Sequence, residues 1–295
     1  MSEYQSYKHR KSESRLLAIP KFLKEYRLFS LALFFLCLLV FCAITAPVIS
    51  PYDPGEIHLK NKNSLPSAEH LLGTDYLGRD TLSRLLYGAQ TSLFIAFVTV
   101  LLSAGIGVSA GILAGYFGGR VDDILSRVID VFLPFPGLII ALAILAFIPS
   151  GTYAIILALT LHSWAGFARI VRNDTYSMKT REFVYSARLS GLSDYQIMKN
   201  HILPNIFAPV LILMTLEVGG VILSIAGLSY LGLGIPADIP EWGAMISNGK
   251  EFIRSAPLLT IIPGTVITLV VLLFNILGEE LRAILNPSHD GVQDL

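Results

Sequence analysis

Apolar stretches that contain no charged residue divide the chain into candidate membrane spans. Residues 28–49, 91–117 and 256–277 are three such stretches. Each is long enough for one helix, because about 20 helical residues cross the hydrocarbon core of a bilayer. Residues 206–235 form a fourth stretch, interrupted only by Glu217. These stretches predict four membrane-spanning helices.

Residues 131–168 also lack charged side chains but are too many for one span. A single helix of this length would measure about 57 Å, far more than a bilayer accepts. The turn signal Pro149-Ser150-Gly151 divides the stretch, so we expect two antiparallel helices joined there. The chain is therefore predicted to be an all-α integral membrane protein with six transmembrane helices.

Prolines and glycines inside the predicted spans suggest how the helices bend and pack. Pro134 and Pro136 lie early in the third span and should kink it, because proline donates no backbone hydrogen bond. Small residues let membrane helices approach closely. We expect such packing from Gly105, Gly107, Gly111, Gly115, Gly219 and Gly220.

The distribution of Lys and Arg predicts the orientation, because these residues are retained on the cytoplasmic side. With both termini inside, sixteen of the 22 basic residues lie on cytoplasmic segments. The predicted organisation is a cytoplasmic segment 1–27, a first helix 28–50, an external loop 51–90, a five-helix core 91–281 and a cytoplasmic tail 282–295.

Composition agrees with a multi-pass protein of the cytoplasmic membrane. Hydrophobic residues make up 53% of the 295 residues and charged residues only 15%, unlike a soluble domain. The 22 basic and 22 acidic residues give a formal net charge of zero. A nucleic-acid binder needs a basic surface, so we expect contact with the lipid bilayer and none with nucleic acid.

The longest cytoplasmic stretch between predicted spans, residues 173–205, should form two short helices. Thr180 is a candidate N-cap of the first, and Gly191 can take the left-handed conformation that ends it. Ser193 and Gln196 predict a capping box for the second helix. That helix should end near Pro204, which cannot continue it without losing a hydrogen bond.

The first of these helices is expected to offer a mostly small surface to a partner outside the membrane. Phe183, Ala187 and Ser190 share one face at helical spacing, and Arg181 and Arg188 lie elsewhere. An amphipathic helix lying on the lipid surface is the alternative interpretation of the same pattern.

The spacing from Ala187 to Gly191 and on to Ile202-Leu203-Pro204 resembles the EAA loop of ATP-binding-cassette (ABC) importer permeases. In that family the loop docks on the ATPase. The usual Glu-Ala-Ala is Tyr185-Ser186-Ala187 here, and Glu182 is a candidate substitute for the acidic residue. The resemblance implies the following ATPase-coupling residues: Glu182, Ser186, Ala187, Gly191, Leu203 and Pro204.

Two further blocks resemble the dipeptide, oligopeptide and nickel permeases. One runs over residues 70–84, and the other combines residues 229–236 with Glu241-Trp-Gly-Ala-Met245. The similarity covers about residues 28–287 and fits the C-type permease half. It implies a type I importer fold, a second, B-type permease subunit, two ATP-binding subunits and an extracytoplasmic solute-binding protein.

The resemblance favours import of di- or oligopeptides, with nickel or a metal chelate as the alternative substrate. No row of His, Met or Cys suited to a bare metal lines the spans. A stand-alone ion-coupled transporter would need several intramembrane charges, but the predicted spans contain only Glu217.

No catalytic residue, metal site or bound cofactor is expected in the chain itself. The Gly-x-x-x-x-Gly-Lys-Ser/Thr sequence that cradles ATP phosphates is absent, so partner subunits must bind the ATP. Cys37 and Cys42 lie in one apolar run, where no nearby histidine completes a metal-ligand spacing.

Two polar residues inside the spans are candidates for a role in transport. An ionised Glu217 near mid-span must face protein or water. We expect it to meet a substrate amine on the translocation pathway or, as the alternative, to be protonated and bonded to a neighbouring helix. His162 is expected to be a hydrogen-bonded packing residue.

The outer segments carry charges and a tryptophan. Asp75, Arg79, Asp80 and Arg84 alternate in sign, which predicts a local salt-bridged cap or, as the alternative, a contact with the binding protein. Trp242 is expected to be an anchor at the membrane interface.

Overall fold

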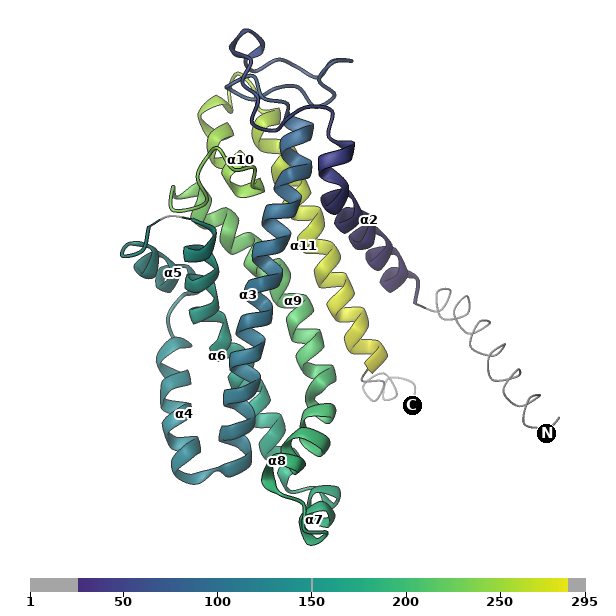
Figure 1. Cartoon of the computed structure of the whole chain (residues 1–295), viewed down its shortest axis with the longest axis vertical. Coiled ribbons are helices and arrows are strands. Elements are labelled where there is room, and N and C mark those ends of the chain that lie inside the picture. Colours follow the sequence, from purple (N-terminus) through teal and green to yellow (C-terminus); the bar gives the residue numbers. More distant parts are fainter. Residues whose placement is uncertain (1–25, 150, 286–295) are drawn as a thin grey trace, which may run out of the picture.

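The computed structural model describes residues 26–149 and 151–285, and their elements are helices (Figure 1). The predicted segments 1–27 and 282–295 therefore lie largely outside the described residues. The long helices are α2 (Arg27–Ile49), α3 (Thr81–Phe117), α6 (Thr152–Lys179), α9 (Leu203–Tyr230) and α11 (Leu258–Leu285). The shorter elements are η1 (Leu59–Asn61), α4 (Gly119–Phe132), α5 (Gly137–Leu145), α7 (Glu182–Leu189), α8 (Asp194–Ile197), η2 (Met198–Ile202), α10 (Trp242–Gly249) and η3 (Lys250–Phe252).

Five of the described helices are long and apolar enough to cross a membrane, and a bent pair makes a sixth span if it is counted as one. The prediction of six spans holds in this form. The third span is not a single helix, however, because α4 and α5 meet at 85°. Pro134 and Pro136 lie in the break between them, so the predicted kink is confirmed and is larger than a bend within one helix.

The long helices form an elongated bundle with different structures at its two ends (Figure 1). Helices α7 and α8 lie at one end, which the basic residues assign to the cytoplasm. The segment 50–80 lies over the opposite, outer end, close to α10. Helix α3 runs along the bundle between these two ends.

Close packing of α3 against α6 holds the centre of the bundle together. A Cβ atom at Gly111 would lie 2.7 Å from the carbonyl oxygen of Ala168, and one at Gly115 would lie 2.6 Å from that of Arg172. The predicted close approach is confirmed here and also at Gly107. It is wrong for Gly105 and Gly220, where a Cβ would have nothing within 4 Å. At Gly219 the contact is an ordinary one, since a Cβ would lie 3.4 Å from the side chain of Val271.

The outer surface of α2 is apolar, as expected for a helix in lipid. Phe34, Phe41 and Ile44 are each more than half exposed, whereas Ala32 and Ala46 are buried against the bundle. An exposed face of this kind would destabilise a soluble protein but is the normal surface of a transmembrane helix.

Candidate functional site

Helices α7 and α8 are joined by a tight turn at the cytoplasmic end of the bundle. Gly191 has a φ of +80°, so the predicted left-handed residue is confirmed. The predicted capping box is confirmed as well. The Ser193 hydroxyl accepts a hydrogen bond from the backbone N–H of Gln196, and the Gln196 side chain accepts one from the backbone N–H of Ser193 at 2.9 Å.

Two predicted boundaries of this segment are wrong. Thr180 does not cap α7, because it follows the last residue of α6 and Arg181 takes the N-cap position. Pro204 does not end the second helix, since α8 continues through the π-helix η2 into α9. Pro204 follows directly on the π-helix, where the regular hydrogen-bond ladder of the helix is interrupted, so a residue without an N–H can be accommodated. The segment after Gly191 is therefore connected directly to the fifth span.

Helix α7 turns two apolar residues inward and leaves its other side open. Val184 is 1% exposed and Ala187 is 6% exposed, and both belong to a cluster with Ile197 of α8. The predicted outward face is therefore wrong for Ala187. Glu182 and Ser186 are exposed, as is Gly191.

A groove of about 670 Å³ lies where α6 ends and α7 begins. It is lined by Met178, Thr180, Arg181, Glu182, Phe183 and Asn205. Leu203 and Pro204, at the start of α9, are also exposed. The candidate coupling residues other than Ala187 are thus exposed, and Glu182 lines the groove.

Tyr116, which sequence reasoning did not single out, contacts both short helices from the end of α3. Its hydroxyl donates to Asp194 Oδ1 at 2.6 Å and accepts from Arg188 Nη2 at 3.2 Å. The bond with Tyr116 raises the pKa of the Arg188 guanidinium above its usual value, so Arg188 stays cationic at the membrane surface. The only sequence signal is a tyrosine at the end of an apolar span, and that signal is common.

Inside the bundle, Glu217 of α9 accepts a hydrogen bond from Ser163 of α6 at 2.7 Å and is half-buried. His162, the neighbour of Ser163, packs beneath the start of α5. A Cβ at Gly137 would lie 2.3 Å from His162 Nε2. Packing is confirmed for His162, but its buried Nδ1 makes no hydrogen bond with the described residues, so the expected bond is not formed there.

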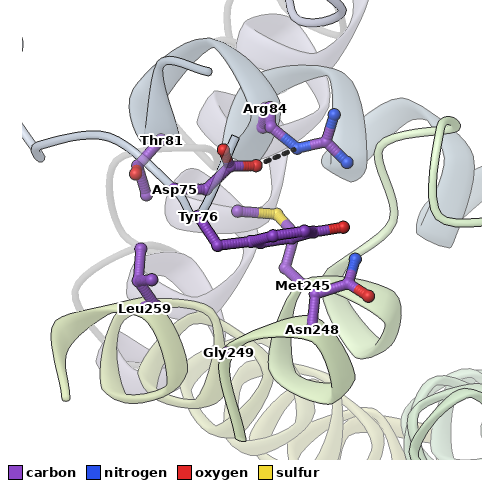
Figure 2. Close-up of a pocket in the computed structure, with 8 residues that line it drawn as sticks. All are labelled: Asp75, Tyr76, Thr81, Arg84, Met245, Asn248, Gly249 and Leu259. Carbon is purple, nitrogen blue, oxygen red and sulfur yellow. Dashed lines mark ion pairs between the residues drawn. The ribbon is translucent and has the colours of Figure 1, made fainter. Parts of the chain in front are cut away.

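A network of ion pairs joins Asp75, Arg79 and Arg84 at the outer end, which confirms the predicted salt-bridged cap. Arg79 pairs with Asp75 at 2.7 Å, and Asp80 caps α3 by accepting from the backbone N–H of Ser83. Arg84 lies 3.7 Å from Asp75 and donates to the carbonyl oxygens of two loops. Figure 2 shows the ion pair of Asp75 and Arg84 at the wall of a small cavity. The cavity has a volume of about 20 Å³, room for about one water molecule.

A second buried network lies beneath this cap, around Glu241 and Trp242. Glu241 is 1% exposed and accepts hydrogen bonds from Ser92 of α3, Ser229 of α9 and the first turn of α10. Trp242 is completely buried and donates from Nε1 to the carbonyl oxygen of Leu85 at 3.0 Å. The predicted interfacial anchor is therefore wrong, because the indole stabilises contacts between helices inside the protein.

Among the residues that the structure describes, no three His, Cys, Asp or Glu side chains lie together as metal ligands would. The polar residues instead form separate groups at the cytoplasmic end, within the bundle and at the outer end. Such a distribution fits a membrane protein with surfaces for partners at both ends.

Two family models match the chain. Residues 107–290 match the binding-protein-dependent transport system inner membrane component, and residues 21–66 match the N-terminal transmembrane domain of oligopeptide transport permease C. The first match includes α4 to α11, with the α7–α8 turn. The second includes α2 and the start of the outer segment.

Curated relatives are similar over nearly the whole chain. A dipeptide transport system permease of Alkalihalophilus pseudofirmus is 38% identical over 90% of this chain and 88% of its own length. A nickel transport system permease of Escherichia coli K12 is 38% identical over 87% of this chain and 93% of its own. A glutathione transport system permease of Escherichia coli O6:K15:H31 is 40% identical, with 92% and 89% covered.

The fold is also found among solved structures. An inward-facing structure of the MetNI methionine ABC transporter has a chain that matches with a TM-score of 0.57 and 19% identity. The match covers 68% of this chain and 96% of that one. This likeness confirms the expected ABC permease fold. The chain belongs to the family of inner membrane components of binding-protein-dependent transport systems, as a multi-pass permease subunit without catalytic activity of its own.

Proposed function

We propose that this chain is the C-type permease subunit of an importer for di- or oligopeptides. In this proposal it pairs with a B-type permease, two ATP-binding subunits dock at the cytoplasmic end, and an extracytoplasmic binding protein delivers the peptide. The peptide substrate is proposed because the chain is 38–40% identical to permeases named for dipeptide and glutathione transport. Family membership argues against a stand-alone ion-coupled transporter.

Nickel import is the second candidate, because a nickel permease is as similar as the dipeptide permease. The two candidates differ in what the cell accumulates. Cells lacking this chain, with and without a plasmid copy, should be tested for uptake of a labelled dipeptide, labelled glutathione and radioactive nickel. We expect the plasmid to restore dipeptide uptake. Restoration of nickel uptake alone would replace the peptide proposal by the nickel one.

The ATPase docks, in this proposal, on the exposed side of α7 and the groove beside it. Glu182 lines that groove, and Ser186 lies on the same helix. Ala187 contributes indirectly and does not contact the ATPase, because its buried side chain packs α7 onto the bundle. Gly191 lets the chain reverse into α8, and Leu203 with Pro204 completes the surface at the start of α9.

Gly191→Arg tests this docking, and Gly232→Arg is its matched control. Both glycines have a positive φ, +80° and +82°, and at both an added Cβ would have nothing within 4 Å. They differ in position, since Gly232 follows α9 at the outer end. A tagged chain should co-purify with ATPase subunits as wild type and as Gly232→Arg, and lose them as Gly191→Arg. Equal recovery with both variants would contradict docking at this turn.

Glu217 is proposed to line the translocation pathway and to meet the amino group of the peptide. Its carboxylate is held by Ser163 yet remains only half-buried, which supports access from a pathway. Glu217→Gln should therefore reduce uptake of a free dipeptide more than uptake of the same dipeptide with an acetylated amino terminus. An equal reduction for both peptides would assign Glu217 to helix packing.

A further inference from the structure

One hydroxyl group joins three elements at the cytoplasmic end. Tyr116 lies in the last turn of α3, Arg188 in the last turn of α7 and Asp194 in the first turn of α8. The Tyr116 hydroxyl donates to Asp194 at 2.6 Å and accepts from Arg188 at 3.2 Å. It therefore bridges the two sides of the Gly191 turn and connects both to a transmembrane helix.

The hydrogen bonds of Tyr116 fix an orientation that the apolar contacts around it do not fix. Tyr116 is 3% exposed, and its ring belongs to the apolar cluster that also holds Val184 and Ala187. Small apolar contacts alone would let α7 slide or rotate, because hydrophobic packing has no preferred direction. Hydrogen bonds weaken steeply when misaligned, so the two bonds of the hydroxyl define how α7 and α8 sit on α3.

The position of α3 makes the bridge relevant to transport. With 37 residues, α3 is about 55 Å long at 1.5 Å per residue, and it reaches the outer end (Figure 1). There Arg84 donates to the carbonyl oxygen of Ala237 at 3.1 Å, and Ser92 donates to Glu241 at 3.0 Å. A displacement of α7 and α8 that moves α3 would thus reach the outer loops.

We propose that Tyr116 is a positioning residue that couples movement of the α7–α8 pair to α3. This inference rests on the proposed docking of ATPases at α7. Without the hydroxyl, the ATPases still bind and move α7, but α3 follows less closely. ATP is then hydrolysed with less solute transported per turnover.

Tyr116→Phe removes the hydroxyl and keeps the buried ring. The matched control is Tyr176→Phe, because Tyr176 lies near the same end on α6 and is 62% exposed. The complete transporter with its binding protein is reconstituted in vesicles, and dipeptide uptake and ATP hydrolysis are measured together. We expect Tyr116→Phe to lower the peptide transported per ATP by about fivefold or more, a usual size for coupling between sites, and Tyr176→Phe to leave it unchanged.

A purely structural role gives a different result. Loss of folded protein or of assembly lowers uptake and hydrolysis in the same proportion, so the ratio stays constant. Asp194→Ala provides a second variant at an exposed position, which removes the acceptor of the Tyr116 hydroxyl and leaves the Tyr116 ring in place. It should also lower the ratio. The double variant should be no worse than Tyr116→Phe, because the bond to Asp194 is already lost when the hydroxyl is removed.

Failure of this inference can be separated from failure of the proposed function. If wild type co-purifies with ATPases and both variants keep the wild-type ratio, the role of Tyr116 is refuted and docking stands. If no ATPase accompanies the wild-type chain, the proposed function fails, and the role of Tyr116 fails with it.

Discussion

Replacing the buried carboxylate of Glu241 by an amide should destabilise the protein strongly. Oε1 accepts from the Ser92 hydroxyl at 3.0 Å and from the Gly243 backbone N–H at 2.7 Å. Oε2 accepts from the Ser229 hydroxyl at 3.0 Å and from the Ala244 backbone N–H at 2.7 Å. A buried carboxylate is tolerated only with such compensation. Here four donors from three helices supply it.

Glu241→Gln keeps the shape but replaces one acceptor oxygen by an NH₂ group. A hydroxyl can rotate to accept from this group, but the backbone N–H of Gly243 or Ala244 cannot. Either orientation of the amide leaves one of these N–H groups facing another donor. An unsatisfied buried donor costs about 1–3 kcal/mol, and the remaining bonds lose their charge assistance. We therefore expect a loss of about 2–4 kcal/mol in the free energy of unfolding.

The assay is thermal unfolding of the purified chain in lipid nanodiscs, with Glu251→Gln as the control. Glu251 is exposed on η3, shortly after α10, so its change should be almost neutral. Glu241→Gln should lower the Tm by on the order of 5–10 °C, from the relation between unfolding free energy and Tm for folded domains. A Tm within about 1 °C of the Glu251→Gln value would refute the reasoning, because the buried network would then contribute nothing measurable.

Two further predictions concern the bundle. Gly137→Ala should destabilise the start of α5 by about 1–3 kcal/mol, because the new methyl group would overlap His162. Gly166→Ala is the control in the same unfolding assay. Its methyl group would meet nothing within 4 Å, so the change should be neutral or slightly stabilising. Asp122→Asn should lower the free energy of unfolding by about 1–2 kcal/mol, because the bidentate ion pair with Arg172 of α6 is lost. Its exposed neighbour gives the control, Asp123→Asn, and a high salt concentration should reduce the difference between the two.

Features that depend on neighbouring residues could be predicted from the sequence. The left-handed Gly191 and the capping box of Ser193 and Gln196 involve residues at most three positions apart, so their chemistry is visible in a short window. The membrane spans could be found for a similar reason, because each requires a continuous apolar run. A short window gave the wrong prediction at Pro204, where a helix end was expected but the π-helix η2 lets the chain continue into α9.

The partners of residues that bond across long sequence separations could not be predicted. The partner of Trp242 is 157 positions away, that of Glu241 on α3 is 149 away, and that of Tyr116 on α8 is 78 away. Composition predicts an interfacial place for a tryptophan near a membrane end, but tertiary packing buries this one. The 85° break after α4 was foreseen only as a kink, because its angle depends on how α5 packs over His162.

The buried hydrogen bonds at the Tyr116 end and the Ser92 end of α3, together with the glycine contacts, restrict how α3 can move. At Gly111 and Gly115 the backbones of α3 and α6 are too close for one helix to slide past the other without a clash. We therefore expect α3 and α6 to move as one body, by rotation. Such a rotation shifts the Tyr116 end and the Ser92 end of α3 in a fixed relation, so both ends can respond to one event. The break between α4 and α5, which lies one helix after α3, then provides a bend where the chain can absorb the rotation.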